Sequence, residues 1–119
     1  MNKIYKKYIK IIKKIIKKLN IYIYIYMSNL VKYGVEFLGT FIFLSVILST
    51  GEPIAIAVAL LAAIYFGGSV SGGHFNPAVT FMKLVNREIE SVDALMYVLV
   101  QLAGAYAAYM FVTKIVRKH

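Results

Sequence analysis

The chain has 119 residues, of which 61% are hydrophobic and 16% are charged, and it contains no cysteine. Ordinary soluble domains carry about 45–50% apolar and about 25% charged residues, and disordered chains carry even fewer apolar residues. The composition therefore excludes disordered, collagen-like and disulfide-stabilised proteins, as well as zinc sites built from cysteine. It indicates a multi-pass integral membrane protein with one small helical bundle.

The net charge of +9 comes almost entirely from the first 27 residues. This segment holds eight lysines and no acidic residue, whereas residues 28–119 hold six basic and five acidic residues. The high isoelectric point is therefore a property of the N-terminal segment. It gives no reason to expect a nucleic-acid partner, and the rest of the chain carries no nucleic-acid motif.

Residues 1–27 are predicted to form a basic amphipathic helix. Lysines recur every three or four positions from Lys3 to Lys18, with Ile, Tyr and Leu between them, so one helical face is cationic and the other apolar. Such a helix lies in the membrane interface and favours anionic lipid. The Ile–Tyr repeat over residues 21–26 either extends the first span or lies at the headgroups. An alternative interpretation is a mis-assigned start: AT-rich DNA upstream of a true start at Met27 encodes such repeats.

Residues 28–119 are predicted to form one domain with three membrane spans. A span needs about 20 mostly apolar residues. Suitable stretches lie at residues 30–50, 54–70 and 94–113, and Lys114, Arg117 and Lys118 end the third. Small residues recur every four positions in the last two spans, which lets helices pack closely in lipid. These residues are Ala55, Ala59, Ala63 and Gly67 in one span, and Ala103, Ala107, Gly104 and Ala108 in the other.

The segment between the second and third spans predicts a helix that crosses only half of a membrane. Gly72 and Gly73 disfavour helix, and Pro77 forces the preceding residue out of helical geometry while suiting the first helical position itself. Asn76 is then the capping residue. A helix over residues 77–85 is about 14 Å long, roughly half of the hydrocarbon thickness.

Irregular backbone at membrane depth requires water or protein as a hydrogen-bonding partner. Residues 71–75 are therefore expected to face a water path or a partner. The carbonyl groups of Gly72, Gly73 and His74 would supply acceptors there, beside the donor group of the Asn76 amide. Such a strip can pass a small hydroxylic molecule from acceptor to donor.

These residues resemble the major intrinsic protein family, the aquaporins and aquaglyceroporins. The similar stretches follow one another in order: residues 36–40 in the first span, the loop over residues 71–80 with its Asn76-Pro77-Ala78 (NPA) motif, and Gln101 with Gly104 in the third span. The resemblance implies an all-α membrane protein, an aquaporin-like half repeat with three transmembrane helices and one NPA re-entrant half-helix.

The resemblance also implies roles for individual residues. Glu36 and Gln101 are expected to brace the loop from the first and third spans. The remaining implied residues contact the permeant or line its path: Asn76, Gly72, Gly73, His74 and Ile56. Ile56 falls where the family often places an aromatic residue of the selectivity constriction, so an isoleucine there implies a wider and more apolar point.

The sequence departs from the family pattern in three respects. Family members have six spans and two NPA half-helices in an inverted repeat, whereas this sequence carries the first repeat with one NPA motif. The family's constriction arginine follows the second NPA motif, and here Val79 follows the motif. Met82 lies where the family prefers a small residue.

Three side chains admit a structural and a functional interpretation. Glu36 is expected to be a buried structural carboxylate rather than a proton relay. His74 is expected to bond within the loop, because no second metal ligand stands nearby. Tyr97 is expected to be a packing residue. No nucleophile–base pair, phosphate loop or pair of catalytic carboxylates is present, so neither an enzyme nor a cofactor is expected.

These observations predict a component of a passive membrane channel for water or small neutral solutes such as glycerol. We expect the lipid bilayer as its environment, and a homo-oligomer or a second half-channel chain to complete the pore. Two copies inserted in opposite senses would imitate the inverted repeat. The alternative is a non-conducting, truncated aquaporin-like protein with a structural or assembly role, or a remnant.

Overall fold

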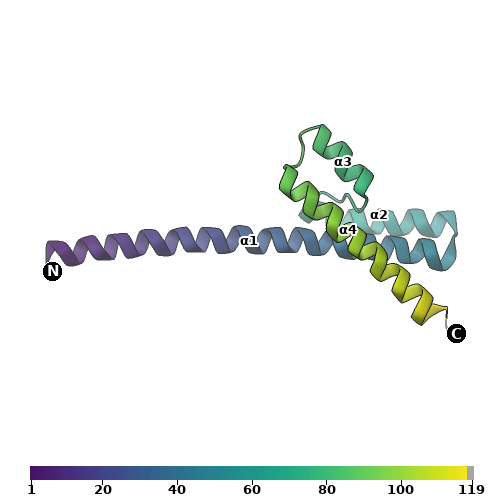
Figure 1. Cartoon of the computed structure of the whole chain (residues 1–119), viewed down its shortest axis with the longest axis horizontal. Helices are drawn as coiled ribbons and strands as arrows, with labels where there is room; N and C mark the ends of the chain where they lie inside the picture. Colours follow the sequence, from purple (N-terminus) through teal and green to yellow (C-terminus); the bar gives the residue numbers. More distant parts are fainter. Residues whose placement is uncertain (118–119) are drawn as a thin grey trace. The chain divides into compact units, whose positions relative to one another are not determined.

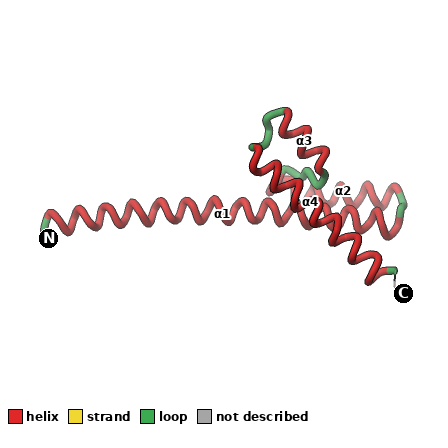
Figure 2. The backbone as a smooth tube through the Cα atoms, in the orientation of Figure 1, coloured by secondary structure: helices red, strands yellow, loops and turns green. Residues whose placement is uncertain are grey.

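The computed structural model describes residues 1–117 and consists of helices joined by short connections (Figures 1 and 2). The described residues contain no β-strand. Three helical segments are long and apolar enough to cross a membrane, which confirms the expected all-α membrane fold. In chain order the elements are α1 (Lys3–Thr50), α2 (Pro53–Ser71), α3 (Pro77–Val85), α4 (Ser91–Phe111) and a π-helical turn, η1 (Val112–Val116).

The chain divides into two compact units, with the boundary between Leu30 and Val31 inside α1. The first unit is helical from Lys3, and almost all of its side chains are exposed. The second unit holds the rest of α1 and all the following elements. It contains every buried side chain in the described part of the chain.

Local sequence signals start and stop the helices of the second unit. Gly51, with φ at 63°, ends α1 in the left-handed region that favours glycine. The carboxylate of Glu52 then caps α2 by accepting a hydrogen bond from the Ala55 backbone N–H at 2.7 Å, and Pro53 occupies the first helical position. Gly72 ends α2 with φ at 91°.

Several helix boundaries differ from the expected spans. The basic helix expected over residues 1–27 and the first span expected over residues 30–50 are one uninterrupted helix, α1. Ser71, expected in the irregular segment, is the last residue of α2, and α4 begins at Ser91, three residues before the predicted start at Ala94. The first turn of α4 is polar, so a search for apolar spans cannot detect it. Of the three bases expected to end the third span, Lys118 lies outside the described residues.

Close packing at small residues joins α4 to α1 within the second unit. A Cβ atom placed on Gly104 would lie 2.6 Å from the backbone oxygen of Phe37, so only glycine allows this approach. Ala108, one turn further along α4, is completely buried. Ala103 is exposed, so of the two predicted small-residue stripes in this helix, the one containing Gly104 and Ala108 forms the contact.

Candidate functional site

The loop between α2 and α3 has an unusual backbone that the surrounding helices stabilise. Gly73 and Phe75 both adopt positive φ, at 65° and 49°, and for a phenylalanine this conformation is strained. The Phe75 side chain is 2% exposed. Its ring lies where Cβ atoms on Gly39 of α1 and Gly67 of α2 would clash, at 2.1 Å and 3.0 Å. The two glycines therefore form the slot that holds the ring.

Glu36 of α1 is fully buried, and its carboxylate accepts four hydrogen bonds. Two come from loop backbone N–H groups, His74 at 2.9 Å and Phe75 at 2.7 Å. The Ser71 hydroxyl donates at 2.6 Å and the Gln101 amide at 3.0 Å. One carboxylate thus satisfies loop donors that lipid could not, which is the geometry a bracing role requires.

Gln101 of α4 connects the same carboxylate to the first turn of α3. Its amide donates to the Thr80 hydroxyl at 2.9 Å, and Thr80 is completely buried. The Thr80 hydroxyl also lies 3.0 Å from Nδ1 of the buried His74 ring. The chain of contacts from Glu36 to His74 therefore links α1, α4, α3 and the loop in one polar network.

Tyr97 lies one turn before Gln101 on α4, and its hydroxyl donates to the Ser71 carbonyl at 2.6 Å. The sequence interpretation treated Tyr97 as a packing residue and gave no side-chain role to Ser71 or Thr80. Spacing carried a signal for Tyr97, because residues four apart share a helix face. The buried positions of α4 follow this spacing: Ala94, Tyr97, Gln101, Gly104 and Ala108.

Asn76 and Pro77 start α3. The Asn76 side-chain oxygen accepts a hydrogen bond from the Ala78 backbone N–H at 2.8 Å, so it caps the helix. Asn76 is exposed, and within residues 1–117 its amide nitrogen donates no hydrogen bond. Likewise, the carbonyl oxygens of Gly72, Gly73 and His74 accept none from the described part of the chain. The side-chain amide of Asn76 and the three loop carbonyls therefore have no hydrogen-bond partner within residues 1–117, and they follow one another along a short strip of the chain.

The structure does not bring every predicted site residue to this strip. Ile56 lies in the first turn of α2 and is half-buried. Ser71 ends the same helix fifteen residues later, which at 1.5 Å per residue is about 22 Å away. If Ile56 contributes to selectivity, it does so well away from the strip formed by the loop carbonyls and the Asn76 amide, and not as part of that strip.

A polar cavity of about 350 Å³ opens beside Ser71, Gly72 and His74. Lys83 of α3 and Glu88 of the α3–α4 connection also line the cavity, and they form an ion pair. Hydrogen bonds from Lys83 and then Asn86 hold the pKa of Glu88 below its usual value. No group of three or more potential metal ligands is assembled among residues 1–117. Of the three loop residues with unpartnered carbonyls, Gly72 and His74 line this cavity and Gly73 does not.

The three long apolar helices and the short helix with its polar loop define a multi-pass integral membrane protein. Residues 22–119 match the family described as major intrinsic protein. The chain therefore belongs to this family, as its motifs predicted.

Curated relatives support the same assignment. The chain is 46% identical over 86 residues to glycerol uptake facilitator protein-like 6 of Lactiplantibacillus plantarum, a match that covers 65% of this chain and 40% of the relative. It is 39% identical over 84 residues to aquaporin-5 of Sus scrofa, covering 60% and 32%. It is also 39% identical over 87 residues to aquaporin-B of Dictyostelium discoideum, covering 61% and 30%. The chain thus spans less than half the length of these relatives. No solved structure matches it.

Proposed function

We propose that this chain is a component of a passive channel for water or small neutral solutes such as glycerol. The observation that carries the proposal is the strip at the start of α3, where the Asn76 amide and the carbonyls of Gly72, Gly73 and His74 have no partner within residues 1–117. The names of the relatives, a glycerol facilitator and aquaporins, agree with transport rather than catalysis.

The strip suits a molecule that both donates and accepts hydrogen bonds. A water or alcohol oxygen would accept from the Asn76 amide while its hydrogens bond the carbonyls, so that each contact replaces one made in bulk water. The N-terminus of α3 adds a partial positive charge beside Asn76, which disfavours cations. The network around Glu36 holds the carbonyls in place, and a rigid lining requires this support.

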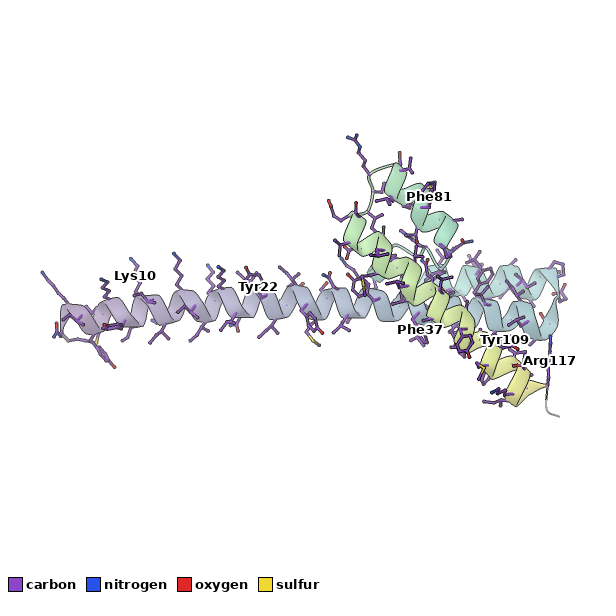
Figure 3. All side chains as sticks on the ribbon, viewed as in Figure 1. Lys10, Tyr22, Phe37, Phe81, Tyr109 and Arg117 are labelled. Atoms are coloured by element: carbon purple, nitrogen blue, oxygen red, sulfur yellow. The ribbon has the colours of Figure 1, made fainter. Side chains whose placement is uncertain are left out.

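A second NPA unit would complete the conduit. Asn76 is exposed, and so are apolar side chains of α3, including Phe81 and Val85 at 66% and 67%. Figure 3 labels Phe81 on this helix. Lipid can cover these apolar side chains but cannot bond the free carbonyls and amide. We propose that the second NPA half-channel comes from another copy of this chain inserted in the opposite sense, or from a separate chain. With Val79 after the motif and Ile56 at the constriction position, such a homodimer would exclude larger solutes less strictly than a channel with the family's arginine.

Stopped-flow measurement of water and glycerol permeability in vesicles containing the purified protein tests the proposal. The informative variant is Asn76→Asp, because aspartate keeps the capping oxygen and removes the amide donor. Its permeability should fall well below that of the wild type. Ser49→Ala is the matched control, since Ser49 is exposed and bonds only within its own helix.

Protein density provides a second readout. If two copies assemble reversibly, permeability should rise with the square of the protein-to-lipid ratio at low density. Permeability equal to that of empty vesicles at every density, with folded protein present, would reject transport by this chain and favour a non-conducting structural or assembly role. A normal rate for Asn76→Asp would contradict the donor role of Asn76.

A further inference from the structure

The first unit carries a surface that the channel proposal does not use. Residues 3–20 of α1 present two separate faces, and we name them by composition. The basic face consists of the eight lysines between Lys3 and Lys18, and the apolar face consists of all Ile, Tyr and Leu residues between Ile4 and Leu19. At about 100° per residue the lysines fall within an arc of roughly 140°, and the apolar residues within the opposite arc of roughly 160°.

Both faces are uncovered in the described structure. Side chains on the apolar face, apart from the half-buried Ile9, are exposed, for example Ile12 and Ile15 at 53% each. No lysine on the basic face has an acidic partner, because the first unit contains none. Lys10 and Tyr22 can be seen in Figure 3 extending from the helix into open space. A helix with these two faces requires a partner that offers apolar and anionic groups side by side.

We propose that residues 3–20 dock on the anionic surface of the membrane, with the apolar face in the headgroup–acyl boundary and the basic face among acidic lipid headgroups. Because the same helix, α1, continues into the first span, this placement includes a bend of α1 between residues 21 and 30, next to the boundary between the two units. A bilayer containing acidic lipid satisfies both faces at once. The segment that follows fits this placement, because Tyr22, Tyr24 and Tyr26 precede the first span, and tyrosine is enriched at the membrane–water boundary.

The charge and composition of the two faces favour an anionic bilayer over two other partners, a second copy of this chain and a nucleic acid. A second copy pairing through the apolar face would cover the apolar side chains but leave both basic faces on the outside, without an acidic residue in either segment to pair with the lysines. A nucleic acid would match the basic face but leave Ile12, Ile15 and Ile16 in water, because it offers no apolar surface of comparable size. The anionic bilayer is therefore the partner that matches both faces.

Site-directed labelling of the full chain tests the proposal cleanly, because the sequence has no cysteine. Ile12→Cys places a nitroxide label on the apolar face, and Lys10→Cys places the matched label on the basic face. Each protein is reconstituted in phosphatidylcholine vesicles with 0, 10 or 30% phosphatidylglycerol. Relaxation by oxygen reports lipid immersion of the label, and relaxation by a water-soluble nickel complex reports exposure to water.

The label on Ile12→Cys should become lipid-immersed as the anionic fraction rises, with roughly a tenfold or larger change in the ratio of immersed to water-exposed label. The label on Lys10→Cys should stay accessible to nickel. Raising the salt from 0.1 M to 1 M should reverse the immersion, because the screening length falls from about 10 Å to about 3 Å. Changing all eight lysines to glutamine keeps helix propensity and should abolish the response.

Three results would overturn the proposal. The first is a label at Ile12 that stays in water, or stays immersed, regardless of anionic lipid. The second is spin–spin broadening between copies that persists at every lipid composition, which would identify a second copy as the partner. The third is immersion or ordering induced by a short DNA duplex in purely zwitterionic vesicles. The lipid titration of the wild-type lysine sequence decides the question even if the eightfold variant fails to insert.

Discussion

Residues 3–30 of α1 and the loop over residues 71–80 both have a defined backbone conformation, but these conformations have different physical origins. The N-terminal segment buries no side chain and is organised by hydrogen bonds inside a single helix. The loop contains four buried residues and takes its shape from donors and acceptors on α1 and α4. Local sequence is sufficient to specify the first segment, whereas the second depends on contacts between residues 21 to 65 positions apart.

The largest difference between these regions should appear when Glu36 is changed to Gln. The glutamine keeps the shape of the side chain but removes the charge and directs an NH₂ group at donors that now lack an acceptor. We expect the free energy of unfolding in detergent to fall by about 3 kcal/mol or more, as unsatisfied buried donors cost about 1–3 kcal/mol each. Thermal unfolding followed by circular dichroism measures it. Ile15→Ala, an exposed residue of the first segment, should change stability by less than about 0.5 kcal/mol.

Equal effects of these two substitutions would contradict the contrast between a locally ordered segment and a tertiary one. A loss of helix signal for Ile15→Ala as large as that for Glu36→Gln would show that the first segment also supports the second unit.

Two glycine-to-alanine substitutions, at Gly104 and Gly34, test whether close helix packing occurs at Gly104 and not at Gly34. Gly104→Ala would place a Cβ atom 2.6 Å from the Phe37 backbone oxygen, so α1 and α4 must separate. Overpacking of this kind costs about 1–3 kcal/mol. Gly34 lies in α1, and a Cβ atom placed on it would have nothing within 4 Å. Gly34→Ala should therefore raise the free energy of unfolding by about 0.5–1 kcal/mol, because alanine favours helix more than glycine does. Denaturant titration of both variants should give changes of opposite sign, and the same sign would refute the close approach at Gly104.

The polar network should respond more weakly to Thr80→Val. Valine matches threonine in shape but removes the hydroxyl that contacts Gln101 and His74. A loss of about 1–2 kcal/mol is expected, the usual effect of leaving buried partners unsatisfied. Thr113→Val is the control, because the Thr113 hydroxyl bonds only to Tyr109 of its own helix turn. Hydrogen exchange at the His74 and Phe75 amides should accelerate in Thr80→Val and stay slow in the control.

Acid should produce the smallest effect, at the exposed ion pair between Lys83 and Glu88. The pKa of Glu88 is lower in the folded protein than in the unfolded chain, because Lys83 and Asn86 donate to its carboxylate. The pair therefore stabilises the fold above the ordinary glutamate pKa of about 4.3, and the contribution disappears as the pH falls through the lower folded value. Comparing the wild type with Glu88→Gln between pH 7 and pH 3 measures this, and the difference between them should shrink toward acid. A difference that grows toward acid would show that the sign is wrong.

Much of the fold followed from patterns along the chain. Hydropathy indicated three spans, and the Asn76-Pro77 pair predicted a short helix at the position where α3 begins. Both signals are local: the length of an apolar run must match the bilayer, and proline fixes the backbone of its own residue and the one before it. The first turn of α4, which begins at Ser91, was not predicted as part of the third span, because its residues are mostly polar.

The site was predictable only in part. The family resemblance implied the positions of Glu36 and Gln101 beside the loop, and Glu36 is also unusual as a carboxylate in an apolar span. The structure places Glu36 in hydrogen-bond contact with the Phe75 amide of the loop and with Gln101. Thr80 and Ser71 did not stand out, because hydroxyl residues are common in membrane helices and carry no comparable signal. The role of Phe75 also depends on the space between Gly39 and Gly67, which are 28 residues apart and share no local pattern.

The sequence by itself determined that the chain crosses a membrane in helices, that its N-terminal segment has a basic and an apolar face, and that a half-length helix begins at Pro77. These properties depend on the balance of apolar, charged and helix-breaking residues within a few turns. Only the tertiary structure decided which carboxylate oxygen meets which loop amide, and which loop carbonyls have no partner within residues 1–117. Hydrogen bonds act over about 3 Å, and distant segments reach that separation only when the helices pack.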